Sequence, residues 1–145
     1  MKLSRECRYA LVGLTTLASK SPGTVMGAAA LSEEAGLPPP FMAKILQQLA
    51  KRGVLISYRA SPRGYVLARP AGEITVREVL EAIDGDDLFQ RCVFCRETCN
   101  ADHPCALHDA WAPVMQQTVN TFSRMTIADI GAVAEHGWPS SLRRS

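Results

Sequence analysis

No stretch of about 18 consecutive apolar residues occurs in the sequence, so no segment is expected to cross a membrane as a helix. Charged residues make up only 21% of the chain against 47% hydrophobic residues, which excludes wholesale disorder and favours a packed core. The glycine motifs of an oxyanion hole or a phosphate-binding loop are also missing. The sequence therefore does not predict an enzyme, even though Cys105 and His108 lie close together in it.

An export signal is not expected either. The basic start and the apolar run after it have a superficial similarity to a signal peptide, but Glu6 lies in the basic part and no small-residue cleavage site follows. Apolar residues recur there at helical spacing instead, at Leu3, Cys7, Leu11, Leu14 and Ala18. We therefore expect a cytoplasmic protein, in which clustered cysteines indicate metal or redox chemistry more often than structural disulfides.

Helical and strand patterns follow one another in an informative order. Apolar periodicity, prolines and glycines predict two strands, at 54–56 and 65–67, and helices over 3–19, 27–35, 39–52, 75–85 and 106–129. Three helices followed by a basic hairpin is the order of a winged helix-turn-helix. The expected fold class is mainly α with a small β-hairpin wing: a winged helix-turn-helix plus a long C-terminal dimerisation helix.

The charge of the chain is unevenly distributed. Residues 1–70 carry ten Lys and Arg residues against three Glu residues, a net charge of +7. Residues 71–145 carry six basic residues against eleven acidic ones, a net charge of −5. This imbalance predicts that the first half of the chain faces a polyanion, and double-stranded DNA is the partner that a winged helix-turn-helix suggests.

The polar face of the third predicted helix supplies the expected base contacts. Lys44, Gln47 and Gln48 lie mostly opposite its apolar residues, where donors and acceptors could meet base edges in the major groove. In the wing, Arg59 and Arg63 are expected to reach phosphates or the adjacent minor groove.

The predicted helix over 106–129 carries an apolar seam at nearly coiled-coil spacing, formed by Leu107, Trp111, Val114, Thr118, Phe122 and Met125. One long helix cannot bury such a seam on a small winged domain alone, so a homodimer is expected. Pro113 lies inside the helix and predicts a kink or a local break. A dimer would hold two recognition helices about one turn of DNA apart, which implies a pseudo-palindromic operator.

Four of the five cysteines, Cys92, Cys95, Cys99 and Cys105, lie within one short segment at C-x2-C-x3-C-x5-C spacing. Thiolates select zinc, copper(I) or iron–sulfur clusters. Zinc usually takes two tight cysteine pairs separated by a longer loop, and the second pair is missing, so the spacing favours a cluster. Zinc and metal-free reactive thiols remain alternatives. The fifth cysteine, Cys7, is expected to be a small buried hydrophobic residue on the first helix.

Three segments carry a family resemblance: MKLSRECRYALVGL, GLPPPFMAKILQQLAKRGVLISYRASPRGYVLARP and TVREVLEAIDG. They resemble the Rrf2 family of bacterial transcription regulators, in particular its IscR and NsrR types, over essentially residues 1–130. The R-Y-A-L opening, the R-x-x-x-x-G-Y-x-L wing and three spaced cysteines before a long helix are specific in combination. The resemblance implies a homodimeric winged-helix regulator whose cysteine loop holds an iron–sulfur cluster, either [2Fe-2S] or [4Fe-4S].

The resemblance also implies a ligand set. Three cysteines would hold the cluster, Cys92, Cys99 and Cys105, and the histidine that IscR-like members use as fourth ligand corresponds to His108. NsrR-like members use a carboxylate on the first helix of the partner subunit, and Arg8 occupies that position here and cannot ligate. Alternative fourth ligands are Cys95, Glu6 of the partner subunit and Cys7 of the partner subunit. The extra Cys95 and the six residues between Cys92 and Cys99, where five are commoner, depart from the family pattern.

The expected function is that of a DNA-binding transcription regulator, a repressor, that senses redox state, nitric oxide or iron status through its cluster. The alternative is a zinc-stabilised winged-helix protein without cluster sensing. The expected parts are a DNA-binding domain over 1–84, a cluster-binding loop over 85–105, a dimerisation helix over 106–130 and a flexible tail over 131–145.

Overall fold

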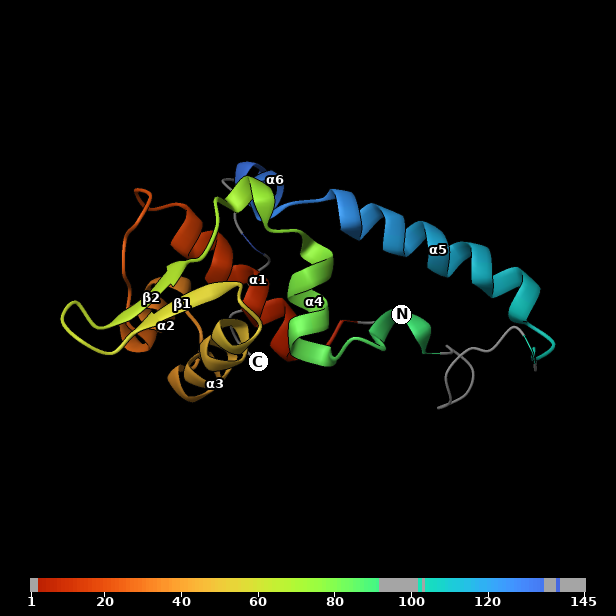
Figure 1. Ribbon diagram of the computed structural model, residues 1–145, viewed down its shortest axis with the longest axis horizontal. Helices are drawn as coiled ribbons and strands as arrows, with labels where there is room; N and C mark the ends of the chain where they lie inside the picture. Colours follow the sequence, from red (N-terminus) through yellow and green to blue (C-terminus); the bar gives the residue numbers. More distant parts are fainter. Residues whose placement is uncertain (1–2, 92–101, 103, 135–137, 139–145) are drawn as a thin grey trace.

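The computed structural model describes residues 3–91, 102, 104–134 and 138. Its elements in chain order are α1 (Arg5–Ala18), α2 (Ala28–Ala35), α3 (Pro39–Lys51), β1 (Leu55–Tyr58), β2 (Gly64–Leu67), the short 3-10 helix η1 (Ala71–Glu73), α4 (Val76–Asp84), a second 3-10 helix η2 (Leu88–Gln90), α5 (His108–Arg124) and α6 (Ile127–Ala134). Figure 1 shows that α1 to α4 and the hairpin form one body, from which α5 extends as a long arm. The expected fold class, mainly helical with a winged hairpin, is confirmed.

Local signals in the sequence explain where the helices of the body begin and end. Ser4 caps α1, because its side chain accepts a hydrogen bond of 3.0 Å from the backbone N–H of Cys7. Gly36 ends α2 in the left-handed conformation, with φ of 70°, which a glycine adopts without strain. Pro39 then opens α3, at a position where no backbone N–H needs a partner. These turns set the angle between α2 and α3.

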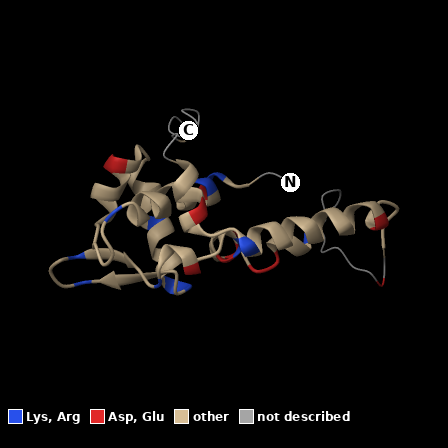
Figure 2. Ribbon diagram, turned by 90° about the horizontal axis from the view of Figure 1, so that it is seen from above, with Lys and Arg blue, Asp and Glu red and all other residues tan. Residues whose placement is uncertain are grey.

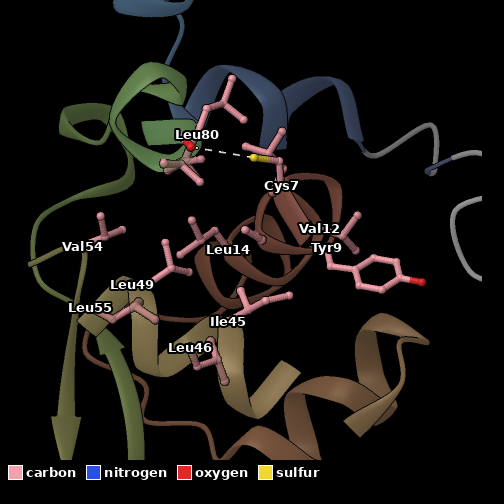
Figure 3. Close-up of a cluster of buried hydrophobic side chains, with 14 of the residues drawn as sticks. Cys7, Tyr9, Val12, Leu14, Ile45, Leu46, Leu49, Val54, Leu55 and Leu80 are labelled. Atoms are coloured by element: carbon pink, nitrogen blue, oxygen red, sulfur yellow. Dashed lines mark hydrogen bonds between the residues drawn. The ribbon is translucent and has the colours of Figure 1, made fainter. Parts of the chain in front are cut away.

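The hydrophobic core lies between α1, α3 and α4, and Figure 3 shows its central side chains. Tyr9 and Leu14 of α1 and Leu46 of α3 are each only 1% exposed. Burial of one large apolar side chain stabilises the folded state by about 1.5–3 kcal/mol relative to leaving it exposed. Cys7 is fully buried, and its thiol donates to the backbone oxygen of Leu80 at 3.8 Å, so the expectation that it belongs to the core is confirmed. Desolvation raises the pKa of this thiol to about 12.

Strand β2 of the wing is paired on both of its edges, and one of these pairings anchors the wing to the body. On one edge β1 pairs antiparallel with β2, from Leu55 opposite Leu67 to Tyr58 opposite Gly64. On the other edge the backbone N–H of Met26 donates to Tyr65 at 3.0 Å, and that of Tyr65 donates back at 2.8 Å. Gly64 has a φ of 147°, and a Cβ there would lie 2.5 Å from the backbone of Met26. Only glycine therefore fits where the wing contacts the body.

The C-terminal helical region differs from the prediction. The single helix predicted over 106–129 is two helices, because Met125 is extended and the second helix, α6, begins only at Ile127. The backbone N–H of Thr126 donates to the Asp129 carboxylate at 2.9 Å, and that of Asp129 donates to the Thr126 hydroxyl at 3.2 Å. The helix runs unbroken through Pro113, so the break falls at Met125 and not at the proline.

Backbone pairing holds this break in place. The N–H of Val76 donates to Met125 at 2.8 Å, and the N–H of Ile127 donates to Ile74 at 2.9 Å. Ile127 is fully buried, and α6 returns to lie against α1 (Figure 1). The range 131–145, expected to be a flexible tail, therefore begins with the last turn of α6, and Trp138 packs against the core.

Candidate nucleic-acid interface and metal-binding segment

Helix α3 presents an exposed polar stripe opposite its buried face. The buried residues are Met42, Ile45, Leu46 and Leu49. Exposed residues recur at intervals of four, three and four positions, at Pro40, Lys44, Gln47 and Lys51. Of the three contacts predicted on this helix, Lys44 and Gln47 are exposed, and Gln48 is half-buried at the flank of the stripe. Lys51 shares the stripe but was not among the predicted contacts.

The stripe is electrostatically suited to a polyanion. The first turn of α3 contains no acidic residue, and its last turn contains Lys51. The cation at Arg52, one position further, is paired with Asp86 and is not free to join the stripe. Amide and ammonium donors on an exposed helix face of this kind can hydrogen-bond to base edges and phosphates in the major groove.

The predicted wing contacts lie in the loop between β1 and β2. Arg59 and Arg63 are both exposed there, and Figure 2 shows basic positions on this hairpin. The Nε of Arg63 donates to the backbone oxygen of Arg59 at 3.2 Å, which closes the loop. On β1, Ile56 and Tyr58 are 44% and 46% exposed. The wing therefore offers two guanidinium groups at its end.

The predicted metal ligands are only partly within the described structure. Cys92, Cys95 and Cys99 lie outside the described residues. Cys105 is exposed, and the backbone N–H of His108 donates to its carbonyl oxygen at 3.0 Å across the turn that precedes α5. Among the residues that the structure describes, no three His, Cys, Asp or Glu side chains gather in a group that could hold a metal ion.

The candidates for a ligand from the partner subunit differ in accessibility. Glu6 has a side chain that is 41% exposed, whereas the Cys7 thiol is fully buried and its raised pKa keeps it protonated. Arg8 lies half-buried on the same helix, and its Nε has no hydrogen-bond partner among the described residues. Glu6 is therefore the one of the two proposed partner ligands that a second chain could reach.

The segment Asp84–Arg91, directly before Cys92, is held by its own charged side chains. The Arg91 guanidinium donates to the backbone oxygen of Asp84 at 2.7 Å and to the carboxylate of Asp87 at 2.9 Å. The hydrogen bond from Arg91 lowers the pKa of Asp87 and raises the pKa of Arg91. Gly85 has a φ of 102°, which accommodates the turn. We call residues 84–91 the leader segment.

The leader segment contacts three helices. The carboxylate of Asp84 accepts a hydrogen bond of 2.8 Å from Ser4, the cap of α1. Asp86 forms an ion pair with Arg52 at the end of α3, and this hydrogen bond raises the pKa of Arg52. The ring of Phe89 lies 6.1 Å from that of Phe122 on α5. A displacement of the leader segment would therefore change contacts with α1, α3 and α5 at the same time.

Helix α5 has no buried residue over its 17 positions. Part of the predicted seam is exposed, with Leu107 at 44% and Val114 at 48%. Another part, Phe122 and Met125, packs against the body of the same chain. The exposed apolar residues of α5 are thus not covered within the single chain. Neither α5 nor any other helix in the described part of the chain is long and apolar enough to span a membrane.

Comparisons with known proteins match nearly the whole chain. A family model, Rrf2, described as an iron-dependent transcriptional regulator, matches residues 3–132. A protein of Aquifex aeolicus named as an HTH-type transcriptional regulator is 31% identical over 144 residues, which cover 97% of this chain and 99% of that protein. The HTH-type transcriptional regulator IscR of Cronobacter sakazakii is 26% identical over 130 residues, which cover 90% of this chain and 80% of IscR.

A solved structure agrees with these sequence matches. CymR, described as the global cysteine regulator of B. subtilis, has a TM-score of 0.76 at 20% identity and covers 92% of this chain and 98% of its own. The family model extends from α1 into α6, so it spans the winged body and the α5 arm alike. The resemblance seen in the sequence is confirmed, and the chain belongs to the Rrf2 family of transcriptional regulators.

Proposed function

We propose that the protein is a homodimeric repressor that binds duplex DNA and responds to the state of an iron–sulfur cluster. The observation that carries the DNA-binding part is the exposed stripe on α3. Lys44, Gln47 and Lys51 point away from a completely buried helix face, and the Arg59 and Arg63 side chains lie in the adjoining wing. Helix α3 enters the major groove, and the wing contacts the flanking backbone or minor groove.

The homodimer forms through α5. The exposed Val114 of α5 and the exposed Leu107 directly before the helix need cover that the single chain does not supply. An apolar cavity of about 490 Å³ between α1, α5 and α6, with Leu3 and Val133 among its lining residues, offers further surface to a second chain. Two protomers related by a twofold axis then read a pseudo-palindromic operator. In this assignment α5 alone replaces the dimerisation range 106–130, because α6 belongs to the body.

The expected cluster-binding loop, 85–105, starts within the leader segment, and its part from 92 to 105, the cysteine segment, holds the cluster. Cys92, Cys99 and Cys105 supply three thiolates, and His108 supplies the fourth ligand, with Cys95 and the partner subunit's Glu6 as alternatives. The turn that joins Cys105 to His108, and the iron dependence in the family's description, support this set. Thiolate and imidazole ligands suit iron–sulfur clusters of either the [2Fe-2S] or the [4Fe-4S] type. Such a cluster supplies sensitivity to oxidant, nitric oxide or iron shortage.

The leader segment transmits the state of the cysteine segment to the DNA-binding surface. Cys92 follows Arg91 directly, so a change in how Cys92 is held displaces a segment that is bonded to α1 through Asp84 and to α3 through Asp86. A ligand shifts an equilibrium only by its differential affinity for two states. The DNA affinities of the cluster-loaded and cluster-free dimers have to be measured to find which of the two binds more tightly.

DNA binding is tested with duplex DNA at several salt concentrations. The dimer should lose about 10³-fold in affinity between low and moderate salt, since several phosphate contacts are released. Arg59→Ala or Arg63→Ala should weaken binding to all sequences alike, whereas Gln47→Ala should change the sequence preference. Affinity that does not depend on salt would contradict the assignment of a phosphate-binding face.

The cluster is tested by anaerobic purification, with iron, sulfide and zinc analysis and a visible spectrum. A colourless protein that contains zinc would favour the zinc-stabilised alternative. Single alanine variants at Cys92, Cys99 and Cys105 should lose iron. Loss of iron in Cys95→Ala with retention in His108→Ala would overturn the choice of His108, and full retention in all three cysteine variants would overturn the cluster.

A further inference from the structure

Arg5, near the start of α1, is held against the recognition helix by an aromatic ring. Its guanidinium carbon lies 4.4 Å from the ring centroid of Phe41 in α3. The same ring makes an edge contact with Tyr9, at 6.2 Å between centroids and 63° between planes. Because Tyr9 is only 1% exposed, the Phe41 ring has a rigid support. The orientation of Arg5 is therefore set by the core and by α3.

Phe41 lies at the edge of the exposed stripe of α3. It directly follows Pro40 and precedes Lys44 by three positions, and residues three apart are neighbours on a helix surface. The N-terminal part of the recognition helix is the part that approaches base edges in helix-turn-helix proteins. Arg5 thus lies beside the stripe at the end of α3 that enters the groove, where the sugar-phosphate backbone borders the bases.

The guanidinium of Arg5 has donors available for an anion. Its side chain is 41% exposed, and the nearest carboxylate contact, with Glu6, is 3.7 Å long, which exceeds hydrogen-bond distance. The Nε is itself buried and has no hydrogen-bond partner among the described residues, so the donors open to an anion are those of the outer nitrogens. A planar guanidinium that is stacked on a ring and keeps its outer N–H groups open matches the geometry of a phosphate.

We infer that Arg5 forms a third DNA-contacting element, in addition to α3 and the wing, and binds a backbone phosphate beside the groove that α3 enters. This inference rests on the proposed DNA-binding function. Phe41 is the positioning residue, since it holds the guanidinium in place and touches no DNA itself. A phosphate contact adds affinity for every sequence and carries no base preference.

The test compares Arg5→Ala with Arg77→Ala in the full-length dimer, with a mixed-sequence duplex as the probe. Arg77 is a matched control, because it is paired with Glu81 and Ser123 on the α4–α5 side of the body and its loss changes the net charge equally. Arg5→Ala should weaken binding by roughly 10-fold and reduce the slope of log affinity against log salt by about one per protomer. Arg77→Ala should change the affinity by less than about twofold.

Two further variants separate phosphate binding from a structural effect. Arg5→Lys should keep the wild-type salt slope while it loses part of the affinity, because the charge remains without the planar fork. Phe41→Leu should weaken binding in the wild-type background but have no further effect when Arg5 is already alanine. Circular dichroism and urea unfolding check that each variant is folded.

The outcomes distinguish this inference from the function on which it rests. A wild-type protein without salt-dependent DNA binding would overturn the proposed function, and this inference with it. Wild-type binding together with an Arg5→Ala variant that behaves like Arg77→Ala would overturn the Arg5 contact alone. A change in base preference in Arg5→Ala, instead of a uniform loss, would also overturn the assignment to a phosphate.

Discussion

Helices α3 and α5 are both amphipathic, but they differ in what covers their apolar sides. Four of the 13 residues of α3 are buried in the body of the chain, whereas none of the 17 residues of α5 is buried. Helix α3 therefore keeps a polar outer face exposed, which is the face proposed to contact DNA. Helix α5 keeps exposed apolar residues such as Val114, although its Phe122 packs against the body. The comparison supports a body that is packed within one chain and an arm whose exposed residues the proposed dimer would cover.

The largest expected effect comes from shortening a core side chain of α3, and it is compared with shortening an exposed side chain at the start of the α5 arm. Leu46→Ala on α3 should reduce the free energy of unfolding by about 2–5 kcal/mol, because the side chain is 1% exposed and leaves a cavity. Its effect should be the same at every protein concentration. Leu107 is 44% exposed, so Leu107→Ala should reduce the free energy of unfolding by less, and the reduction should depend on protein concentration. Urea unfolding measures both variants. Equal, concentration-independent losses would contradict the difference between the two helices.

The next effect is on assembly. Val114→Glu places a charge on the exposed apolar side of α5 and should raise the dimer dissociation constant by roughly 30-fold or more, the cost of losing an interface hot spot. Analytical ultracentrifugation measures the constant. Asn120→Glu, on an exposed position away from the seam, is the control and should leave the dimer intact. A wild-type protein that is monomeric at micromolar concentration would refute the dimer directly.

A smaller effect concerns the link between the leader segment and α3. Asp86→Asn removes the charge that holds Arg52 and should reduce, by a few-fold, the ratio of DNA affinities between the cluster-loaded and cluster-free dimers. The unfolding midpoint should barely change, because the ion pair is exposed. Asp109→Asn, on the exposed first turn of α5, is the control. An unchanged affinity ratio in Asp86→Asn would exclude this pair as the link.

The last effect is absent at neutral pH and appears only at alkaline pH. Burial raises the pKa of Cys7 from 9.0 to about 12, so above pH 9 the unfolded thiol loses a proton that the folded chain retains. The free energy of unfolding should therefore fall as pH rises through this window, by about 1.4 kcal/mol per pH unit for one proton. Cys7→Ala should lack this component. Identical pH profiles for the two proteins in urea unfolding would show that Cys7 does not titrate in this way.

Much of the body and of the proposed DNA-binding surface could be predicted from the sequence because the relevant signals are local. The prolines and Gly36 mark the boundary between α2 and α3, and helical spacing separates Lys44 and Gln47 from the buried residues of α3. The strand pattern and the turn between the strands likewise predicted the hairpin that carries Arg59 and Arg63. Each of these features depends on residues within about one or two turns of each other.

The features that the sequence did not predict depend on distant partners. Arg5 lies over Phe41 from a different helix, and Arg52 pairs with Asp86 across 34 positions of the chain. The break at Met125 had a local signal, the Thr126–Asp129 cap, but the apolar seam continues across it and predicts one helix. Backbone pairing of Met125 with Val76 then decides in favour of two. Spacing along the chain determines which face a residue occupies, whereas only the packed structure determines which distant face lies against it.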